Sequence, residues 1–194
     1  KTNETFSFGS FNSFKKISND PIKVWSKILN NSNSQLYLKN SQGYNEEVYE
    51  NLQKKFKDNG VDLKKIIFLK KSDVNIFLQD YNRIDLALDT FPFNGATTTL
   101  EALWMGVPVI TLTGESYVSR MSTAVLNGAY LSEFCAGSPS SYLDIAQQQA
   151  DRLTWLRDNR YTWRSHLKAS PLGDAGSLIS HLEQAFSQIS VNPI

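Results

Sequence analysis

The sequence has few of the residues that form disulfide bonds or bind structural metal ions. Its 194 residues include one cysteine, Cys135, and two histidines, His166 and His181. One cysteine excludes an intrachain disulfide, and this set of side chains is too small for a closed structural zinc site. Such low cysteine usage is typical of a reducing compartment. We therefore expect a cytoplasmic protein that holds no metal.

Long apolar segments are also absent. The sequence contains no run of about 18 apolar residues, so it predicts no membrane-spanning helix. Its first six residues lack the apolar core of a signal peptide. With 41% hydrophobic and 20% charged residues, the composition is that of a globular protein with one core. No linker or repeat divides residues 1–194, and a strand pattern begins at Phe6. We expect a single domain that is a fragment of a longer protein.

The net charge of +1 is unevenly distributed. Residues 1–83 carry 14 Lys/Arg against 9 Asp/Glu, whereas residues 84–194 carry 6 against 10. A basic first half is compatible with an anionic ligand, including a nucleic acid. The simpler interpretation, which we favour, is that Lys54, Lys55 and Lys57 lie on the solvated face of a helix.

Strand and helix patterns alternate along most of the chain. Apolar segments predict five strands, and helical spacing with cap and stop residues predicts helices between and after them, the first one capped by Asp20. Strands without clean polar alternation indicate burial on both faces, so we predict an α/β fold with a parallel sheet covered by helices on both faces. Ligands of such sheets bind beyond the carboxyl ends of the strands. The expected strands are 6–11, 35–39, 66–69, 84–90 and 107–112; the expected helices are 20–29, 46–59, 73–82, 98–105, 116–127, 139–166 with a break, and 175–189, where Leu178, Leu182, Ala185, Phe186 and Ile189 form an apolar stripe.

The segment 90–106 carries the strongest functional signal, because it runs from a strand through a tight loop into a helix. Gly95 and Ala96 allow a ligand to approach the backbone. Three threonines, residues 97–99, add hydroxyl donors to the free amides of the helix start, which together form an anion site. An alternative remains open at this point: Thr98 and Glu101 have the spacing of a capping box, so Glu101 caps its own helix in that case.

Two other loops follow strands. The loop after the first strand contains Lys16, which can place a flexible positive charge beside a phosphate, or can be a surface lysine. The loop after the third strand contains Lys71 and Ser72, which can border a nucleotide, or can be an ordinary loop in which Ser72 or Asp73 caps the next helix. Asp89 closes the fourth strand and can enter the cleft or bind turn backbone, and we favour the turn.

The remaining polar and aromatic candidates are weaker. Glu115 and Arg120 follow the fifth strand but do not share a helix face. The two histidines and Trp155 and Trp163 lie in the C-terminal helices, where surface or packing roles are expected.

Several stretches resemble one family. IDLALDTFPFNGATTTLEALWMGVPVITLTGES, from Ile84, and the VSR that follows are similar to the C-terminal catalytic lobe of the O-linked N-acetylglucosamine transferase family of SPINDLY-like proteins with tetratricopeptide repeats. FGSFNSFKKI, from Phe8, resembles that family's entry to the lobe, and Ser170-Pro171-Leu172 resembles a later signature. The likeness spans nearly the whole chain and is densest in residues 84–120.

The resemblance implies a GT-B architecture, in which two Rossmann-like lobes surround a cleft and the C-terminal lobe holds the UDP of UDP-N-acetylglucosamine. The N-terminal catalytic lobe of the same polypeptide and the general base are expected outside this chain, so the fragment alone should be inactive. No metal cofactor is implied. By position, the expected UDP contacts are Ser13 and Lys16 at the diphosphate, Lys71 and Ser72 along the uracil and ribose, Gly95, Ala96, Thr97 and Thr98 around the phosphates, and Glu101 at the ribose hydroxyls.

Two positions depart from the family pattern, because better-known members have histidines where this chain has Ala96 and Phe77. We therefore predict the donor lobe of a protein O-glycosyltransferase, with N-acetylglucosamine as the expected sugar and Ser/Thr of a protein or peptide as the acceptor. The missing histidines keep one alternative open, a catalytically degenerate nucleotide-binding scaffold. A nucleic-acid or membrane partner is not expected.

Overall fold

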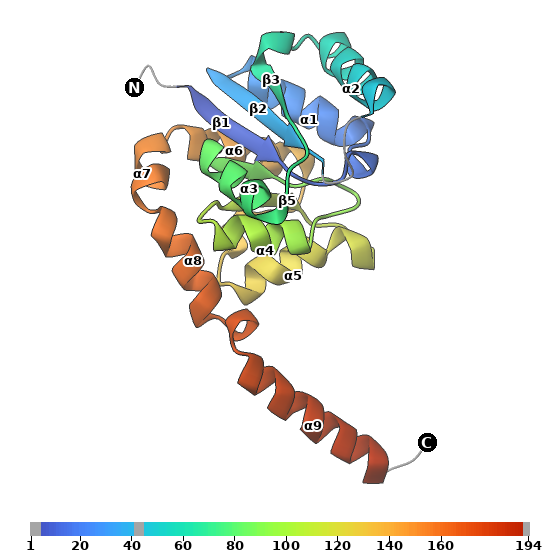
Figure 1. Cartoon of the computed structure of the whole chain (residues 1–194), viewed down its shortest axis with the longest axis vertical. Coiled ribbons are helices and arrows are strands. Elements are labelled where there is room, and N and C mark those ends of the chain that lie inside the picture. The colour runs from blue at the N-terminus through green and yellow to red at the C-terminus, as the bar shows by residue number, and fades with distance from the viewer. Residues whose placement is uncertain (1–4, 41–44, 192–194) are drawn as a thin grey trace.

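A computed structural model describes residues 5–40 and 45–191 of the chain as an α/β structure around one six-stranded sheet (Figure 1). All neighbouring strands run parallel, in the order β3-β2-β1-β4-β5-β6. The predicted parallel sheet is therefore confirmed. The strands are β1 (Phe6–Ser10), β2 (Ser34–Lys39), β3 (Ile66–Leu69), β4 (Leu86–Leu88), β5 (Val109–Leu112) and β6 (Cys135–Ala136).

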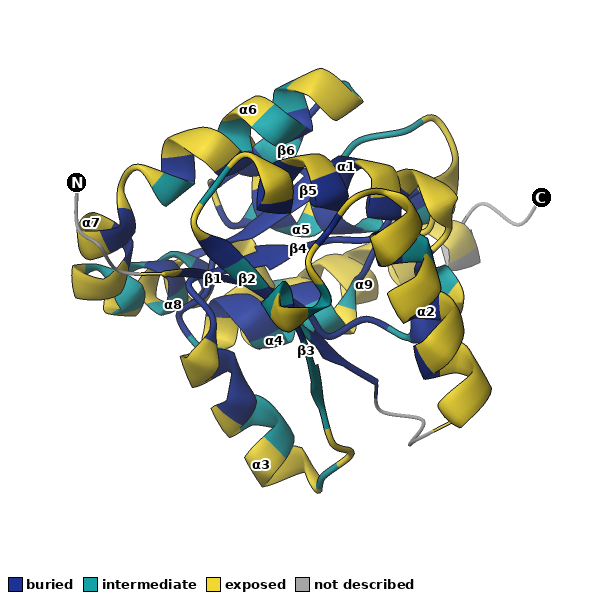
Figure 2. Ribbon diagram, turned by 90° about the horizontal axis from the view of Figure 1, so that it is seen from above, coloured by how far each residue is buried: buried dark blue, intermediate teal, exposed yellow. Residues whose placement is uncertain are grey.

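Helices cover both faces of the sheet, as Figure 2 shows with the sheet seen along its edge. On one face α1 packs against α2 and α6, and on the other face α4 packs against α5 and α8. The helices are α1 (Asn19–Asn30), α2 (Glu46–Asp58), α3 (Val74–Gln79), α4 (Thr97–Trp104), α5 (Met121–Gly128), α6 (Pro139–Ala150), α7 (Leu153–Asp158), α8 (Arg160–Ala169) and α9 (Ala175–Val191), with 3-10 turns η1 (Phe14–Lys16), η2 (Leu63–Lys65), η3 (Asp80–Arg83), η4 (Tyr117–Ser119), η5 (Ser132–Phe134) and η6 (Pro171–Gly173).

The first helix shows how sequence spacing produces the core. Ile22, Trp25 and Leu29 recur at helical spacing on α1 and are almost fully buried, so one stripe of the helix covers the sheet. The prediction that Asp20 caps this helix is wrong. The N-cap position is Ser18, and Asp20 lies inside the first turn, where its charge favours the helix dipole.

Other differences concern element boundaries and one missing strand. The strand predicted over 84–90 is only three residues long, which leaves Asp85 and Asp89 just outside its ends. β6 was not predicted, because two residues are too few to show an alternating pattern. The long C-terminal helical region breaks into α6, α7 and α8, and residues 116–127 divide into a 3-10 turn and α5.

The last helix, α9, extends away from the body of the molecule (Figure 1). The predicted apolar stripe is present on it but is exposed: Leu178 is 59% exposed and Phe186 is 66% exposed. Within the described ranges, no helix combines the length and the apolarity that crossing a bilayer requires.

The sheet order fixes where a ligand can bind. β1 lies between β2 and β4, so the connections after β1 and β4 leave toward opposite faces, and the carboxyl ends of these two strands form the topological switch point of the sheet. The segment 90–98 and the loop that contains Lys16 therefore meet at this switch point, as the sequence indicated.

Candidate functional site

A buried carboxylate, Asp89, organises the switch point. It follows β4 directly, is 1% exposed, and accepts hydrogen bonds from the Gly95 amide at 2.7 Å, the Thr90 amide at 2.9 Å and the Thr111 hydroxyl at 2.7 Å. Burial raises the pKa of Asp89, and these hydrogen bonds partly offset that effect. The prediction that Asp89 binds turn backbone is confirmed.

Asn12 connects the two loops at the switch point. Its amide donates to Asp89 at 3.2 Å, and its carbonyl accepts from the Thr98 hydroxyl at 2.9 Å. The Thr99 hydroxyl is likewise engaged, at 2.7 Å from the Ser122 hydroxyl in the interior. Two of the three threonine hydroxyls that the sequence offered as donors therefore serve the protein, and the exposed Thr97 is the one left to face a ligand.

Gly95 is required for a different reason from the one that its sequence context suggested. A Cβ atom built at this position would lie 2.6 Å from the Thr98 hydroxyl, 2.9 Å from the Thr99 hydroxyl and 3.1 Å from Asp89 Oδ1. The absence of a side chain at Gly95 thus leaves room inside the protein for the start of α4. It also allows the loop to pack closely over Asp89.

The start of α4 has no side-chain cap. The N-cap residue is Ala96, with φ −154° and ψ −76°, and no side chain bonds to the first turn. The capping box of Thr98 and Glu101 is therefore absent. Within the described residues, the amides of Ala96, Thr97 and Thr98 have no hydrogen-bond acceptor, whereas those of Thr99 and Leu100 bond to the Ala96 carbonyl. Free amides at the positive end of a helix dipole favour an anion.

Lys16 supplies positive charge at the same place. It lies in the 3-10 turn after β1, and its Nζ donates to the Asn94 carbonyl at 2.8 Å and lies 4.3 Å from the centre of the Phe93 ring. Partial burial lowers the pKa of Lys16, and the nearby Asp89 charge opposes this change. Beside it, the Ser13 hydroxyl is buried without a hydrogen-bond partner among the described residues. The fold thus brings the predicted Lys16 and the 94–98 loop together.

Glu101 lies one turn into α4, where its backbone carbonyl accepts from the Met105 amide at 2.9 Å, and its carboxylate has no hydrogen-bond donor among the described residues. Its pKa is raised by partial burial. Burial raises the pKa of Tyr81, and the negative charge of Glu101 raises it further; the Tyr81 hydroxyl donates to the Thr98 carbonyl at 3.2 Å. A half-buried carboxylate that does not cap its own helix is available to accept hydrogen bonds from a ligand.

The third predicted loop lies after β3, two strands from β1 and so about 10 Å across the same sheet edge. Lys71 is exposed there, and the Ser72 hydroxyl bonds to Lys39 Nζ at 2.6 Å. Asp73 caps α3 through the Ile76 amide, so the capping alternative is confirmed for that residue. This loop lies at the same edge of the sheet as Lys16.

The remaining candidates lie outside this edge. Trp163 is buried and stacks edge-on with Trp155, and His166 lies beside Trp163, so the expected packing roles are confirmed. Lys54 is exposed on α2 and pairs with Asp58, in agreement with a solvated helix face. In the described part of the chain, no cluster of His, Cys, Asp and Glu side chains has the arrangement of a metal site.

Sequence reasoning missed Asn12 and Tyr81 as parts of the site. Asn12 belongs to a loop in which the glycine and the lysines carried the sequence signal. Its role follows only from the hydrogen bond that its side chain accepts from Thr98 on α4. Tyr81 lies near the end of the helix predicted over 73–82 and carries no motif. Their contribution comes from contacts between residues 17 and 86 positions apart.

The parallel sheet order, with its switch point between β1 and β4 and the uncapped start of α4 beside Lys16, is that of a Rossmann-like domain. The chain belongs to glycosyltransferase family 41, whose model matches residues 2–182.

Three comparisons support this assignment. The chain is 34% identical over 191 residues to a protein of Eustoma exaltatum subsp. russellianum named "Probable UDP-N-acetylglucosamine--peptide N-acetylglucosaminyltransferase SPINDLY". It is 31% identical to the protein of the same name from Oryza sativa subsp. japonica. Each alignment covers 95% of this chain but 20% of the relative, so the chain spans about a fifth of their length.

A solved structure of a Thermobaculum terrenum O-GlcNAc transferase mutant superimposes with a TM-score of 0.83 at 32% identity, over 95% of this chain and 36% of that one. The fold prediction is confirmed, because the chain has the Rossmann-like structure of the C-terminal lobe of a GT-B glycosyltransferase.

Proposed function

We propose that this chain is the donor-binding lobe of a UDP-dependent protein O-glycosyltransferase that transfers N-acetylglucosamine to Ser/Thr side chains. The observation that carries the proposal is the uncapped start of α4 beside Lys16, at the switch point of the sheet. The names of the similar proteins specify UDP-N-acetylglucosamine as donor and a peptide as acceptor. This supports the same substrates here.

In this proposal the diphosphate lies over the free amides of Ala96, Thr97 and Thr98. Lys16 contributes an ammonium group to it, and the Ser13 hydroxyl gains the hydrogen-bond partner that it otherwise lacks. As the bond to the sugar breaks, negative charge develops on the departing UDP. Preorganised amides and an ammonium group stabilise that charge without a reorganisation cost. We propose that they do so without a metal ion.

The rest of the nucleotide extends along the sheet edge toward β3. Glu101 accepts hydrogen bonds from the ribose hydroxyls, and Lys71 and Ser72 border the uracil and ribose, mainly through backbone groups. The intact Lys16, Glu101 and amide set favours a working donor site over a degenerate scaffold.

The rest of the enzyme is also part of the proposal. We place the general base and the acceptor site on an upstream lobe of the same polypeptide, preceded by tetratricopeptide repeats, and expect the 194-residue chain alone to be inactive. The exposed apolar side chains of α9 support such a further lobe, because an apolar helix face of this size usually packs against protein. A cytoplasmic location fits the single cysteine.

Calorimetric or NMR titration of UDP into the folded 194-residue chain tests this proposal. We expect weak binding that Lys16→Ala or Thr97→Ala reduces by about tenfold or more, the loss of a charge-assisted hydrogen bond. Lys15→Ala is the matched control, because Lys15 is the exposed neighbour of Lys16 and should leave binding unchanged. No binding at millimolar UDP by a folded sample would contradict the proposal.

A further inference from the structure

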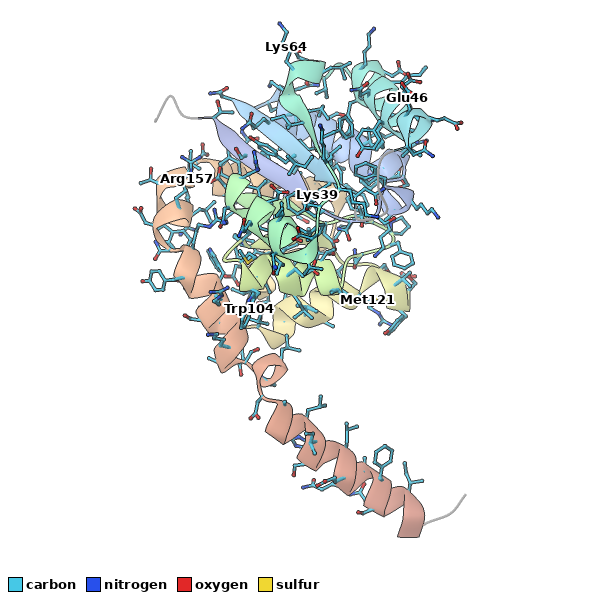
Figure 3. All side chains as sticks on the ribbon, viewed as in Figure 1. Lys39, Glu46, Lys64, Trp104, Met121 and Arg157 are labelled. Carbon is cyan, nitrogen blue, oxygen red and sulfur yellow. The ribbon has the colours of Figure 1, made fainter. Side chains whose placement is uncertain are left out.

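Lys39 is a buried lysine that the proposed donor site does not use. It ends β2, its side chain is fully buried, and its Nζ forms an ion pair with Asp80 and bonds to the Ser72 hydroxyl at 2.6 Å. The ring of Phe77 lies 5.0 Å from Nζ. Figure 3 labels Lys39 in the interior of the body, where an unpaired ammonium group would be strongly disfavoured.

The ion pair is a poor source of stability. Removing two charges from water costs several kcal/mol, and apolar residues of similar volume commonly replace such pairs without loss of stability. Its geometry indicates another role. Lys39 joins three elements that are separate in sequence: the carboxyl end of β2, the loop after β3 through Ser72, and the turn η3 through Asp80.

The position of this network matters because of what adjoins it. Leu38, the residue before Lys39, is paired with Ser10, so the network lies beside the chain segment that leads to Lys16. On its other side is the loop that contains Lys71. Phe77 packs against Phe11 from that same segment, at 5.7 Å between ring centres. The network therefore lies between the anion site and the loop after β3.

We propose that Lys39 is a positioning residue for the nucleoside half of the donor. It holds the loop at 70–73 against the sheet through Ser72, so that the loop's backbone faces the uracil and ribose. This inference rests on the proposed function, and it assigns Lys39 no contact with the donor. Among the described residues, the Lys39 ammonium contacts Ser72, Asp80 and Phe77 and neither Lys16 nor the first amides of α4, so we expect its loss to weaken the nucleoside half of the site more than the diphosphate half.

The test compares UDP with inorganic pyrophosphate as ligands of the 194-residue chain. Lys39→Met keeps the side-chain length and removes the charge, and Asp80 retains Arg83 at 2.9 Å as a partner. We expect the Kd for UDP to rise about tenfold and that for pyrophosphate to change less than about twofold. The control is Lys65→Met, because Lys65 bonds the Leu29 and Ser32 carbonyls at the amino end of β3 and should affect neither ligand.

A double-mutant cycle with Ser72→Ala shows whether Lys39 acts through Ser72. If it does, the double variant binds UDP no more weakly than either single variant, whereas independent effects add. Equal losses for UDP and pyrophosphate, additive effects, or unchanged UDP binding in folded Lys39→Met would each overturn the inference.

Two further outcomes are decisive. If Lys39→Met does not fold, Ser72→Ala with Lys39 intact replaces it, and unchanged UDP binding by that variant overturns the inference. If the unaltered chain binds no UDP, the proposed function fails with it. Binding by the unaltered chain with an insensitive Lys39 variant removes this inference alone.

Discussion

Gly95→Ala tests whether the tight loop over Asp89 shapes the anion site. The added Cβ would lie 2.6 Å from the Thr98 hydroxyl and 2.9 Å from the Thr99 hydroxyl. Neither hydroxyl is free to move, because the first donates to Asn12 and the second pairs with the buried Ser122. The loop itself must shift, and the amides of the α4 start shift with it.

Overpacking of this kind costs about 1–3 kcal/mol. For a chain of this length, that corresponds to a fall in Tm of roughly 2–12 °C. We also expect the Kd for UDP to rise by about tenfold, because displaced amides lose charge-assisted hydrogen bonds. Thermal unfolding followed by circular dichroism measures the first effect, and UDP titration measures the second.

Gly137→Ala is the matched control. Gly137 is exposed between β6 and α6, and a Cβ atom there meets nothing within 4 Å. Its effect on stability should stay within about 0.5 kcal/mol. A Gly95→Ala variant with the Tm and UDP affinity of the unaltered chain would refute the packing argument. A lower Tm with unchanged UDP affinity would instead show that the diphosphate does not bind at the α4 amides.

Two pH dependences follow from the same site. Burial lowers the pKa of Lys16 below the ordinary 10.5, so UDP affinity should fall as the pH rises through that lowered pKa and the lysine loses its charge. Lys16→Arg stays charged and should not show this loss of affinity. Identical alkaline profiles for the two proteins would contradict the assignment. The pKa of Glu101 is raised above the ordinary 4.5, so UDP affinity should fall on acidification at a higher pH than an exposed glutamate would give. Glu101→Gln should bind UDP more weakly, and its affinity should change less with acidification. Pyrophosphate has no ribose, so it should bind the unaltered chain and Glu101→Gln equally well.

The fold class follows from the sequence alone, because apolar strand segments alternate with helical patterns along most of the chain. Ile22, Trp25 and Leu29 predict the buried stripe of α1 before any tertiary contact is known. The glycine and threonine pattern of residues 95–99 also marked the helix start as a candidate anion site. These are local properties, which short-range physical preferences are sufficient to fix.

Which of the candidate groups are free depends on contacts between residues that are distant in the sequence. Thr98 and Thr99 look like Thr97 in sequence, but Asn12 and Ser122 occupy their hydroxyls, and these partners lie 86 and 23 residues away. Glu101 had the spacing of a capping residue, yet the cap does not form and its carboxylate remains available. Lys39 lies at the end of a predicted strand and belongs to no motif, and only the folded sheet shows that it contacts Ser72 and Asp80. Hydrogen-bond partners distant in the chain cannot be inferred from local spacing, so only the folded sheet could show which groups face a ligand.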